Sequence, residues 1–123
     1  MMPQSLNENR RTPRVSHKTR VYFKPGRKSN QKGVVRDVSE TGVFLVTYDK
    51  LYEGLDLILY IPVDILGRES LCVLLGNVVR VEKRPGAEAC GYGVQFKALS
   101  PGAKALLQRF VRTKLRGKDH PQN

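Results

Sequence analysis

Two short groups of polar residues have the types and spacing to bind an anionic or hydrogen-bonding ligand. Residues 10–14 (Arg-Arg-Thr-Pro-Arg) form an R-x-x-x-R pattern, and residues 37–42 (Asp-Val-Ser-Glu-Thr-Gly) form a D-x-S-x-x-G pattern. A guanidinium fork binds paired acceptor oxygens and stacks on planar rings. An ionised carboxylate only accepts hydrogen bonds, so Asp37 suits N–H donors. Pro13 disfavours helix at the residue before it, so we expect Arg10 and Arg14 in an extended segment that is free to wrap a ligand.

Neither pattern identifies a function by itself. A chain with twelve arginines contains R-x-x-x-R by chance, and Arg80 with Arg84 and Arg112 with Arg116 repeat the spacing. Aspartate, serine and glycine are also the usual residues of a tight turn, in which side-chain oxygens cap backbone N–H groups. The information lies in the order of the two patterns and in the elements around them.

The charge of the chain points to a negatively charged partner. There are 22 Lys+Arg against 11 Asp+Glu, which gives a net charge of +11. Such a charge favours a ligand or surface that carries phosphates. The excess is concentrated in residues 10–20 and near the C-terminus. The C-terminal group is more simply explained as the solvated face of an amphipathic helix.

Length and hydrophobicity predict one cytoplasmic domain. The 123 residues, 40% of them hydrophobic, suffice for a single core. The longest apolar stretches, residues 57–61 and 71–75, are far shorter than the about 20 residues that span a bilayer, so we expect no membrane insertion. The first twenty residues lack the apolar centre of a secretory signal. Cys72 reads as a core residue and Cys90 as a loop residue, so no metal site or disulfide is expected.

Six strand patterns precede one helix. Residues 15–23 alternate apolar and polar side chains, as in a half-buried strand. The other predicted strands are residues 33–38, 42–48, 55–61, 71–83 and 92–99, with Pro62 closing the fourth and Gly76 marking a bulge or bend in the fifth. Six strands without intervening helices predict an antiparallel barrel in a mainly β protein.

The apolar period changes after residue 99. Ser100 suits an N-cap and Pro101 a first helical position, and Gly117 is the natural stop. Apolar residues recur at helical spacing between them: Ala103, Leu106, Leu107, Phe110, Val111 and Leu115. A helix with one apolar stripe should pack on the barrel.

The two patterns in this order, followed by a barrel and a terminal helix, resemble the PilZ domain. The resemblance covers residues 9–116. It includes the strand signature at residues 92–96 (Tyr-Gly-Val-Gln-Phe) and the helix opening at residues 99–101 (Leu-Ser-Pro). It implies a six-stranded antiparallel barrel of the split-barrel type and a PilZ domain at residues 10–116. We expect a disordered lead at residues 1–9 and a disordered basic tail at residues 117–123.

The resemblance also implies a bacterial receptor for the second messenger cyclic di-GMP that is not an enzyme and needs no cofactor or metal. The family's binding residues correspond here to Arg10, Arg14, Asp37, Ser39 and Gly42. Asn9, Arg11 and Gly93 are candidates for further contacts, and in this family the position of Asn9 influences whether one ligand or a stacked pair binds. The signal would pass to an effector protein of motility, pilus or polysaccharide machinery that no residue identifies.

The chemistry of cyclic di-GMP suits these residue types. Each guanine presents O6 and N7 as an acceptor edge and N1–H and N2–H₂ as donors, and the ring carries two phosphodiester charges. Arginine forks fit the acceptors and phosphates, and Asp37 fits the donors. Ser39 offers one further hydrogen bond. Gly42 allows close approach to the backbone because it has no Cβ.

Three other functions compete. A barrel with this charge is compatible with nucleic-acid binding, but such modules stack bases on exposed aromatics, and we expect the five tyrosines and four phenylalanines mostly in the core. The second competing function is that of a PilZ-like adaptor, which binds a protein but no ligand. An enzyme is disfavoured because Ser39 is in no G-x-S-x-G elbow, no glycine-rich phosphate loop is present, and His17 and His120 lack partner residues.

Overall fold

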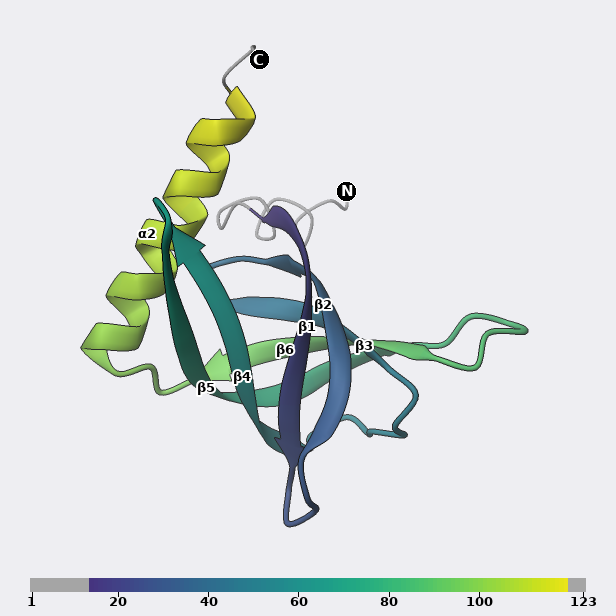
Figure 1. The fold of residues 1–123 in the computed structure, drawn as a ribbon. Coiled ribbons are helices and arrows are strands. Elements are labelled where there is room, and N and C mark those ends of the chain that lie inside the picture. Colours follow the sequence, from purple (N-terminus) through teal and green to yellow (C-terminus); the bar gives the residue numbers. More distant parts are fainter. Residues whose placement is uncertain (1–13, 120–123) are drawn as a thin grey trace, which may run out of the picture.

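The structure is a computed structural model that describes residues 14–119 (Figure 1). Its elements are β1 (Val15–Pro25), β2 (Gln31–Val38), β3 (Gly42–Thr47), β4 (Asp56–Ile65), β5 (Arg68–Glu82), β6 (Cys90–Lys97) and α2 (Pro101–Asp119). This order confirms the predicted mainly β fold with a C-terminal helix. The expectations for residues 1–9, for Arg10 and Arg11, and for residues 120–123 lie outside the described part of the chain.

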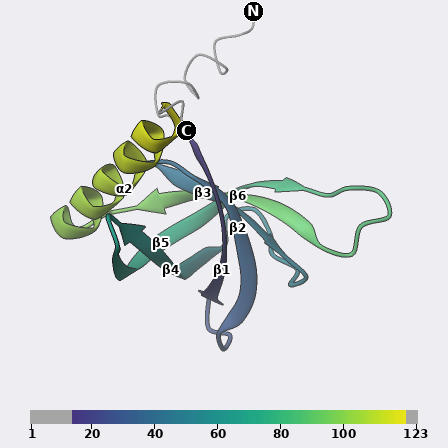
Figure 2. The same ribbon diagram turned by 45° about the horizontal axis from the view of Figure 1, so that its top comes forward.

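The six strands close into a barrel in the order β1-β2-β3-β6-β5-β4. Every neighbouring pair is antiparallel. Closure gives each strand a hydrogen-bonded neighbour on both sides, so that the described sheet has no free edge strand. The β5–β6 hairpin projects from the barrel on the side away from α2, as both views show (Figures 1 and 2).

Alternate residues of the strands fill the barrel, because successive side chains point to opposite faces of a strand. β4 shows the pattern clearly, with every second residue from Leu57 to Val63 at most 1% exposed. Side chains from the other strands complete the interior; among them are Phe23, Val35, Leu45, Leu74, Val78 and Tyr92. The barrel interior is therefore a packed apolar core, and polar groups that bind a ligand must lie on its outer face or at its ends.

β4 continues three residues past its predicted end at Pro62. The β1–β4 pairing stops at Tyr60, so Pro62 lies where β4 has β5 as its strand neighbour and β1 no longer pairs with it. A proline without a backbone N–H is tolerated at such a one-sided position. The hairpin to β5 turns at Leu66 and Gly67, whose φ angles of 52° and 83° match a two-residue turn with both φ positive.

The predicted bulge at Gly76 is wrong. Gly76 stands in regular register with both neighbouring strands, and the register shift of β5 lies at Val79 instead. A Cβ on Gly76 would lie 2.5 Å from a methyl group of Val94, so this glycine serves close packing inside the barrel. Cys72 is buried, as predicted, whereas Cys90 opens β6 and pairs with the end of β3 rather than lying in a loop.

α2 begins as predicted. The Ser100 hydroxyl accepts a hydrogen bond from the Ala103 N–H at 3.1 Å, which is an N-cap contact. The helix extends two residues past Gly117, its predicted stop. A glycine inside a helix costs about 1 kcal/mol relative to alanine, which weakens a helix without ending it. No helix among residues 14–119 combines the length and apolarity needed to cross a membrane.

α2 packs on β4, β5 and β1, and Figure 1 shows the helix beside β4 and β5. Leu107, Phe110 and Val111 are buried in this contact. His17 of β1 meets the same interface, with its ring edge-on to Phe110 and 4.7 Å between the ring centroids. The helix therefore covers one side of the barrel and leaves the wall around β2, β3 and β6 open to solvent.

Candidate functional site

Asp37 faces the outside of the barrel because β2 contains a bulge. Val35 and Val38 are both fully buried, although strict alternation would put one of them outside. The register between β2 and β3 shifts between Val35 and Asp37, so Arg36 is the extra residue. A bulge re-aims the side chains around it. Here it leaves Arg36 and Asp37 both on the solvent side.

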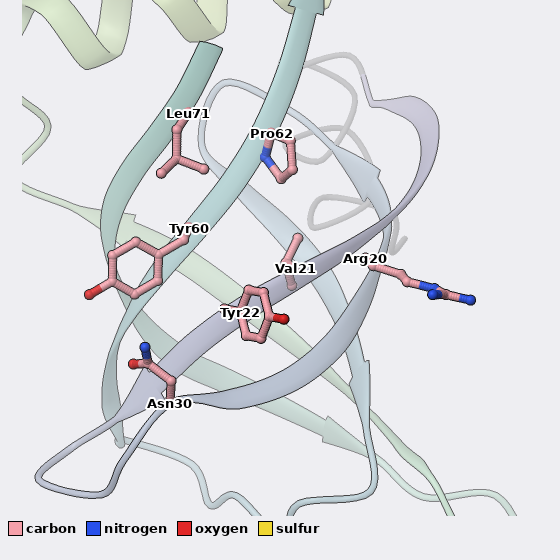
Figure 3. A pocket seen from close by; sticks show the side chains of 7 residues that line it. All are labelled: Arg20, Val21, Tyr22, Asn30, Tyr60, Pro62 and Leu71. Atoms are coloured by element: carbon pink, nitrogen blue, oxygen red, sulfur yellow. The ribbon is translucent and has the colours of Figure 1, made fainter. Parts of the chain in front are cut away.

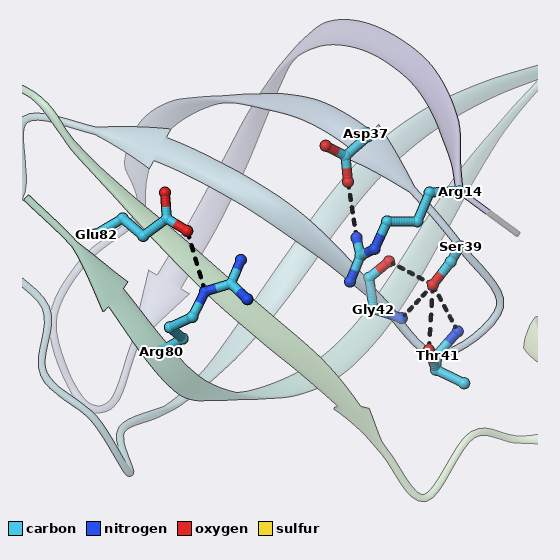
Figure 4. A network of polar contacts seen from close by, with 7 residues as sticks. All are labelled: Arg14, Asp37, Ser39, Thr41, Gly42, Arg80 and Glu82. Atoms are coloured by element: carbon cyan, nitrogen blue, oxygen red, sulfur yellow. Dashed lines mark hydrogen bonds and ion pairs between the residues drawn. The ribbon is translucent and has the colours of Figure 1, made fainter. Parts of the chain in front are cut away.

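The two predicted motifs meet at one ion pair. Arg14 Nη1 donates to Asp37 Oδ1 at 2.7 Å (Figure 4). β1 starts beside the end of β2, where Ser16 pairs with Asp37, and this register brings Arg14 to the carboxylate. The two side chains are 47% and 29% exposed. Such an exposed pair contributes only about 0–1 kcal/mol to stability, so both groups can exchange partners at little cost.

Ser39 lies inside the turn that joins β2 to β3. It is fully buried. Its hydroxyl accepts from the N–H groups of Thr41 at 3.1 Å and Gly42 at 3.2 Å, and it lies within donor distance, 3.3 Å, of the Gly42 carbonyl oxygen (Figure 4). Its own backbone N–H donates to the same carbonyl at 2.9 Å. Local hydrogen bonds of this kind from a serine shape turns. They occupy the Ser39 hydroxyl, which the motif predicts as a contact to the ligand.

Gly42 permits two strands to approach closely. A Cβ at this position would lie 2.2 Å from the carbonyl oxygen of Val94, which is backbone and cannot move aside. The positive φ expected of a turn glycine is absent here, although four other described glycines have one. The physical need for glycine at the end of the motif is thus the β3–β6 contact.

Five residues form an outward row across the barrel wall. Ser16, Asp37, Phe44, Gly93 and Arg80 are successive cross-strand partners from β1 to β5. Directly opposed residues of an antiparallel pair share a face of the sheet. Gly93, a candidate further contact, therefore lies on the same wall as Asp37, two strands away, and Arg80 lies alongside it.

A hollow of about 620 Å³ occupies this wall, and most of its charged residues are cations. It is lined by Arg14, Val15, Ser16, Lys18, Arg36, Asp37 and Arg84. Arg36 and Arg84 are functional candidates that the motifs do not include. Arg84 belongs to an R-x-x-x-R match that the sequence interpretation assigns to chance, yet the β5–β6 hairpin brings it beside Arg14. The other such match contributes Arg112 on the exposed side of α2, away from this wall.

A second hollow, of about 340 Å³, has a different character. It is lined by Arg20, Val21, Tyr22, Asn30, Tyr60, Pro62 and Leu71. Figure 3 shows the Arg20 side chain extending away from Tyr60 and Leu71. Its wall is largely apolar, so it does not offer an anionic ligand the convergent cations of the first hollow.

The expectation that the aromatic residues lie mostly in the core fails for three tyrosines. Tyr22, Tyr48 and Tyr52 are 54%, 74% and 64% exposed. Tyr22 belongs to the outward set of β1, and the other two lie in the β3–β4 connection with their side chains in solvent. No group of three or more histidine, cysteine or acidic residues that could hold a metal ion occurs in the part of the chain that the structure describes.

Comparisons with known proteins identify one family model and several structures with a similar fold. The family model of the PilZ domain matches residues 8–113. The PilZ domain of YcgR with c-di-GMP from Escherichia coli superposes with a TM-score of 0.68 at 20% identity, over 89% of this chain and 93% of that one. The Bacillus subtilis inhibitor of motility MotI/DgrA gives 0.66 at 21% identity, over 87% of this chain and 51% of that one, so this chain spans about half its length.

A third structure, the PilZ domain of CeSA from a cellulose-synthesizing bacterium, gives a TM-score of 0.55 at 15% identity, over 86% of this chain and 98% of that one. No curated protein matches the sequence. Identities this low show a shared fold, whereas the family model covers most of the chain, motifs included. By that match, and with the barrel and terminal helix in place, this chain belongs to the PilZ domain family.

Proposed function

We propose that this protein is a receptor for cyclic di-GMP, which binds on the outer wall of the barrel beside Arg14 and Asp37. The Arg14–Asp37 contact at 2.7 Å is the observation that carries the proposal, because it joins the two motifs at the basic hollow. Arg10 belongs to the same site in this proposal, as the family pattern implies. Ser39 and Gly42 contribute by holding the turn that presents Asp37.

The two charged groups suit the two edges of a guanine. Arg14 supplies a fork for O6 and N7 or for a phosphate, and Asp37 supplies an acceptor for N1–H and N2–H₂. In the free protein each satisfies the other. A guanine that presents both kinds of edge replaces their mutual bond with two bonds to itself, so binding leaves neither charge unpaired. One of the similar structures is described as a PilZ domain with c-di-GMP, which supports this choice of ligand.

The output of the receptor is an effect on another protein. In this proposal the ligand-bound wall is recognised by an effector, and machinery of motility is the first class to test, since one similar protein is described as an inhibitor of motility. Pilus and polysaccharide machinery are the other classes. Catalysis has no part in the proposal.

Calorimetric titration with cyclic di-GMP tests the proposal, with GTP and cyclic GMP as controls. We expect saturable binding of cyclic di-GMP and much weaker binding of the controls. Arg14→Ala should lower the affinity about tenfold or more, because a hydrogen bond to a charged group is worth about 1.5–3 kcal/mol. Arg112→Ala removes the same charge from the exposed side of α2 and should bind as the wild type does. An unchanged titration of folded Arg14→Ala protein would overturn the proposed site.

Binding of single-stranded nucleic acid is a second candidate function, and one observation favours it. The exposed rings of Tyr22 and Tyr48 share a hollow of about 570 Å³ with Arg20 and Lys32. Aromatic rings beside cations are the usual platform for stacked bases. Titration with a single-stranded oligonucleotide in place of cyclic di-GMP separates the candidates. A nucleic-acid-binding module binds the oligonucleotide, and Tyr48→Ala weakens that binding, whereas a cyclic di-GMP receptor binds the dinucleotide with an affinity that Tyr48→Ala leaves unchanged.

A further inference from the structure

Phe44 is a buried aromatic residue that lies outside the barrel core. It is opposite Asp37 on β3 and shares the outward face of that residue. Although it points away from the interior, it is only 8% exposed. Its ring lies against the β6 backbone, where a Cβ on Gly91 would be 2.2 Å from Phe44 Cζ. The glycine therefore makes room for an aromatic ring on the outer wall.

Two guanidinium groups cover this ring. Arg36 Cζ lies 4.9 Å from the ring centroid and Arg80 Cζ lies 5.9 Å from it. Both distances are within the range of cation–π attraction. Arg80 also contacts Glu82 at 3.2 Å, so its charge is compensated. Arg36 makes no ion pair with any side chain that the structure describes, and its charge is therefore available to a ligand.

Arg36 and Arg84 stand between two hollows. Both line the basic hollow of Arg14 and Asp37, and both line a neighbouring hollow of about 240 Å³ whose floor includes Phe44 and Gly91. Both side chains are exposed, and Arg84 makes no ion pair with another described side chain. Glu82 is the acidic residue of the second hollow, and Arg80 neutralises it. The second hollow thus continues the first and retains a positive surplus.

The size of this surface exceeds one guanine. Three strand spacings of about 4.8 Å separate the positions of Asp37 and Arg80, which is roughly 14 Å along the row. A single base bound between Arg14 and Asp37 leaves the second hollow, over Phe44 and Gly91, uncovered, whereas a dinucleotide with two guanines covers both hollows. The second hollow offers what a second guanylate group needs, a planar cation to stack on and a second cation for phosphate.

We propose that Arg36 and Arg84 form a second subsite, in which a guanine stacks on the Arg36 guanidinium above Phe44 and Arg84 binds the adjoining phosphate. This subsite takes a second guanylate group, either the far half of one cyclic di-GMP molecule or a half of the second molecule in a stacked pair. It rests on the proposed function, since it extends the same site. Phe44 acts by holding Arg36 in position for stacking.

The test compares substitutions that remove the same charge from different places. Arg36→Gln, Arg84→Gln and Arg27→Gln each lower the net charge by one, and Arg27 lies in the exposed β1–β2 turn, apart from both hollows. Calorimetric titration with cyclic di-GMP should show about tenfold weaker binding for Arg36→Gln and for Arg84→Gln. Arg27→Gln should stay within about twofold of the wild type. Circular dichroism and thermal unfolding confirm that each variant is folded.

Arg36→Lys separates stacking from charge. Lysine keeps the positive charge but loses the planar fork, so we expect it to bind nearly as weakly as Arg36→Gln. Wild-type affinity in Arg36→Lys would overturn the stacking role. The stoichiometry distinguishes the source of the second guanylate: one ligand per protein indicates the far half of the same molecule, and two indicate a stacked pair.

The outcomes distinguish this inference from the function on which it rests. If the wild type binds and Arg14→Ala does not, while Arg36→Gln and Arg84→Gln match Arg27→Gln, the subsite is refuted and the receptor stands. If all three glutamine variants lose the same amount of affinity for cyclic di-GMP, the loss is explained by the lower net charge alone. That result would also refute the subsite. If the wild type itself does not bind cyclic di-GMP, both proposals fail.

Discussion

The start and the end of the D-x-S-x-x-G segment belong to regions with different tasks. Asp37 faces the basic hollow and shares an exposed ion pair with Arg14. Ser39 is fully buried, and Gly42 is pressed against the backbone of Val94. Under the proposed function, the motif combines recognition and architecture: Asp37 contacts the ligand, and Ser39 and Gly42 hold the turn that positions Asp37. Substitutions in the two regions should therefore affect different measured quantities.

The largest effect is expected from Gly42→Ala. The new methyl group would meet a backbone oxygen at 2.2 Å, so β3 and β6 must separate. We expect the free energy of unfolding to fall by about 3 kcal/mol, at the upper end for overpacking, as measured by urea denaturation. Gly102→Ala is the matched control, because a Cβ there meets open space on α2 and should leave stability equal or raise it by up to about 1 kcal/mol. Equal stability of the two variants would contradict an architectural role for Gly42.

Ser39→Ala should also reduce stability, by about 2 kcal/mol. The change removes the acceptor of two turn N–H groups in a buried position. Ligand affinity should fall only as far as the turn relaxes and Asp37 shifts. Ser29→Ala, in the exposed β1–β2 turn, should change stability by less than about 0.5 kcal/mol. If Ser39→Ala has the stability of the wild type but a lower affinity for the ligand, the architectural role of Ser39 is contradicted. Ser39 would then act in ligand recognition.

Asp37→Ala should show the opposite balance. Its exposed ion pair contributes about 0–1 kcal/mol, so unfolding should change little. Cyclic di-GMP should bind more weakly by about 1 kcal/mol or more, since the guanine donors lose their acceptor. Simple attraction of a polyanion to the basic wall predicts the reverse sign, because the substitution removes a negative charge. Titration of the variant with cyclic di-GMP, and of the wild type with cyclic di-AMP, which lacks O6 and the N2 amino group, decides between the two explanations.

The smallest expected effect comes from His17, which lies under α2, apart from both regions. Burial lowers the pKa of His17 below its ordinary value of 6.5; the hydrogen bond to the Pro62 backbone opposes this shift and the charge of Lys114 adds to it. The unfolded chain therefore takes up a proton near pH 6.5, and the folded protein does so only at lower pH. Stability should be retained above pH 6.5 and decrease as the pH falls below it.

The free energy of unfolding is measured by urea denaturation for the wild type and for His17→Gln. The measurements run from about pH 5 to about pH 8, the range in which histidine titrates. The part of the decrease that disappears in His17→Gln belongs to His17. Ligand affinity at pH 6 should be the same in both proteins, because the interface with α2 is separate from the basic wall. A loss of affinity in His17→Gln would connect the helix to the site.

The sequence predicts the fold more fully than the site. Alternating patterns, runs of β-branched and apolar residues, and the turn residues between them locate all six strands, and Ser100 with the apolar stripe locates α2, because these signals depend on neighbouring residues. The errors occur where distant strands decide the outcome. Pro62 lies inside β4 because β1 pairing has ended, and position 76 is a glycine because the Val94 side chain packs against it, not because the strand bulges there. Neither partner is near in sequence.

Within the site, sequence order is sufficient to bring Arg14 and Asp37 together, because β1 and β2 form a hairpin with a defined register. Sequence order does not place Arg36 or Arg84 at this site. The outward position of Arg36 depends on the bulge in β2. The position of Arg84 depends on the β5–β6 hairpin, in which β6 pairs with β3. A search for R-x-x-x-R finds Arg84 but does not distinguish it from Arg112 on the helix.

The amino-acid sequence by itself determined the element types, the barrel class, the family resemblance and the two motifs, since propensity and periodicity are local properties of the chain. Tertiary structure alone decided which side of the wall each motif residue faces. Asp37 faces outward because a bulge changes the alternation of β2, and Ser39 is enclosed because it lies inside the turn between β2 and β3. The basic wall formed only when ring closure placed β6 between β3 and β5, which are far apart in sequence. A surface that is assembled from five strands requires the register between them, and register depends on contacts across the whole barrel.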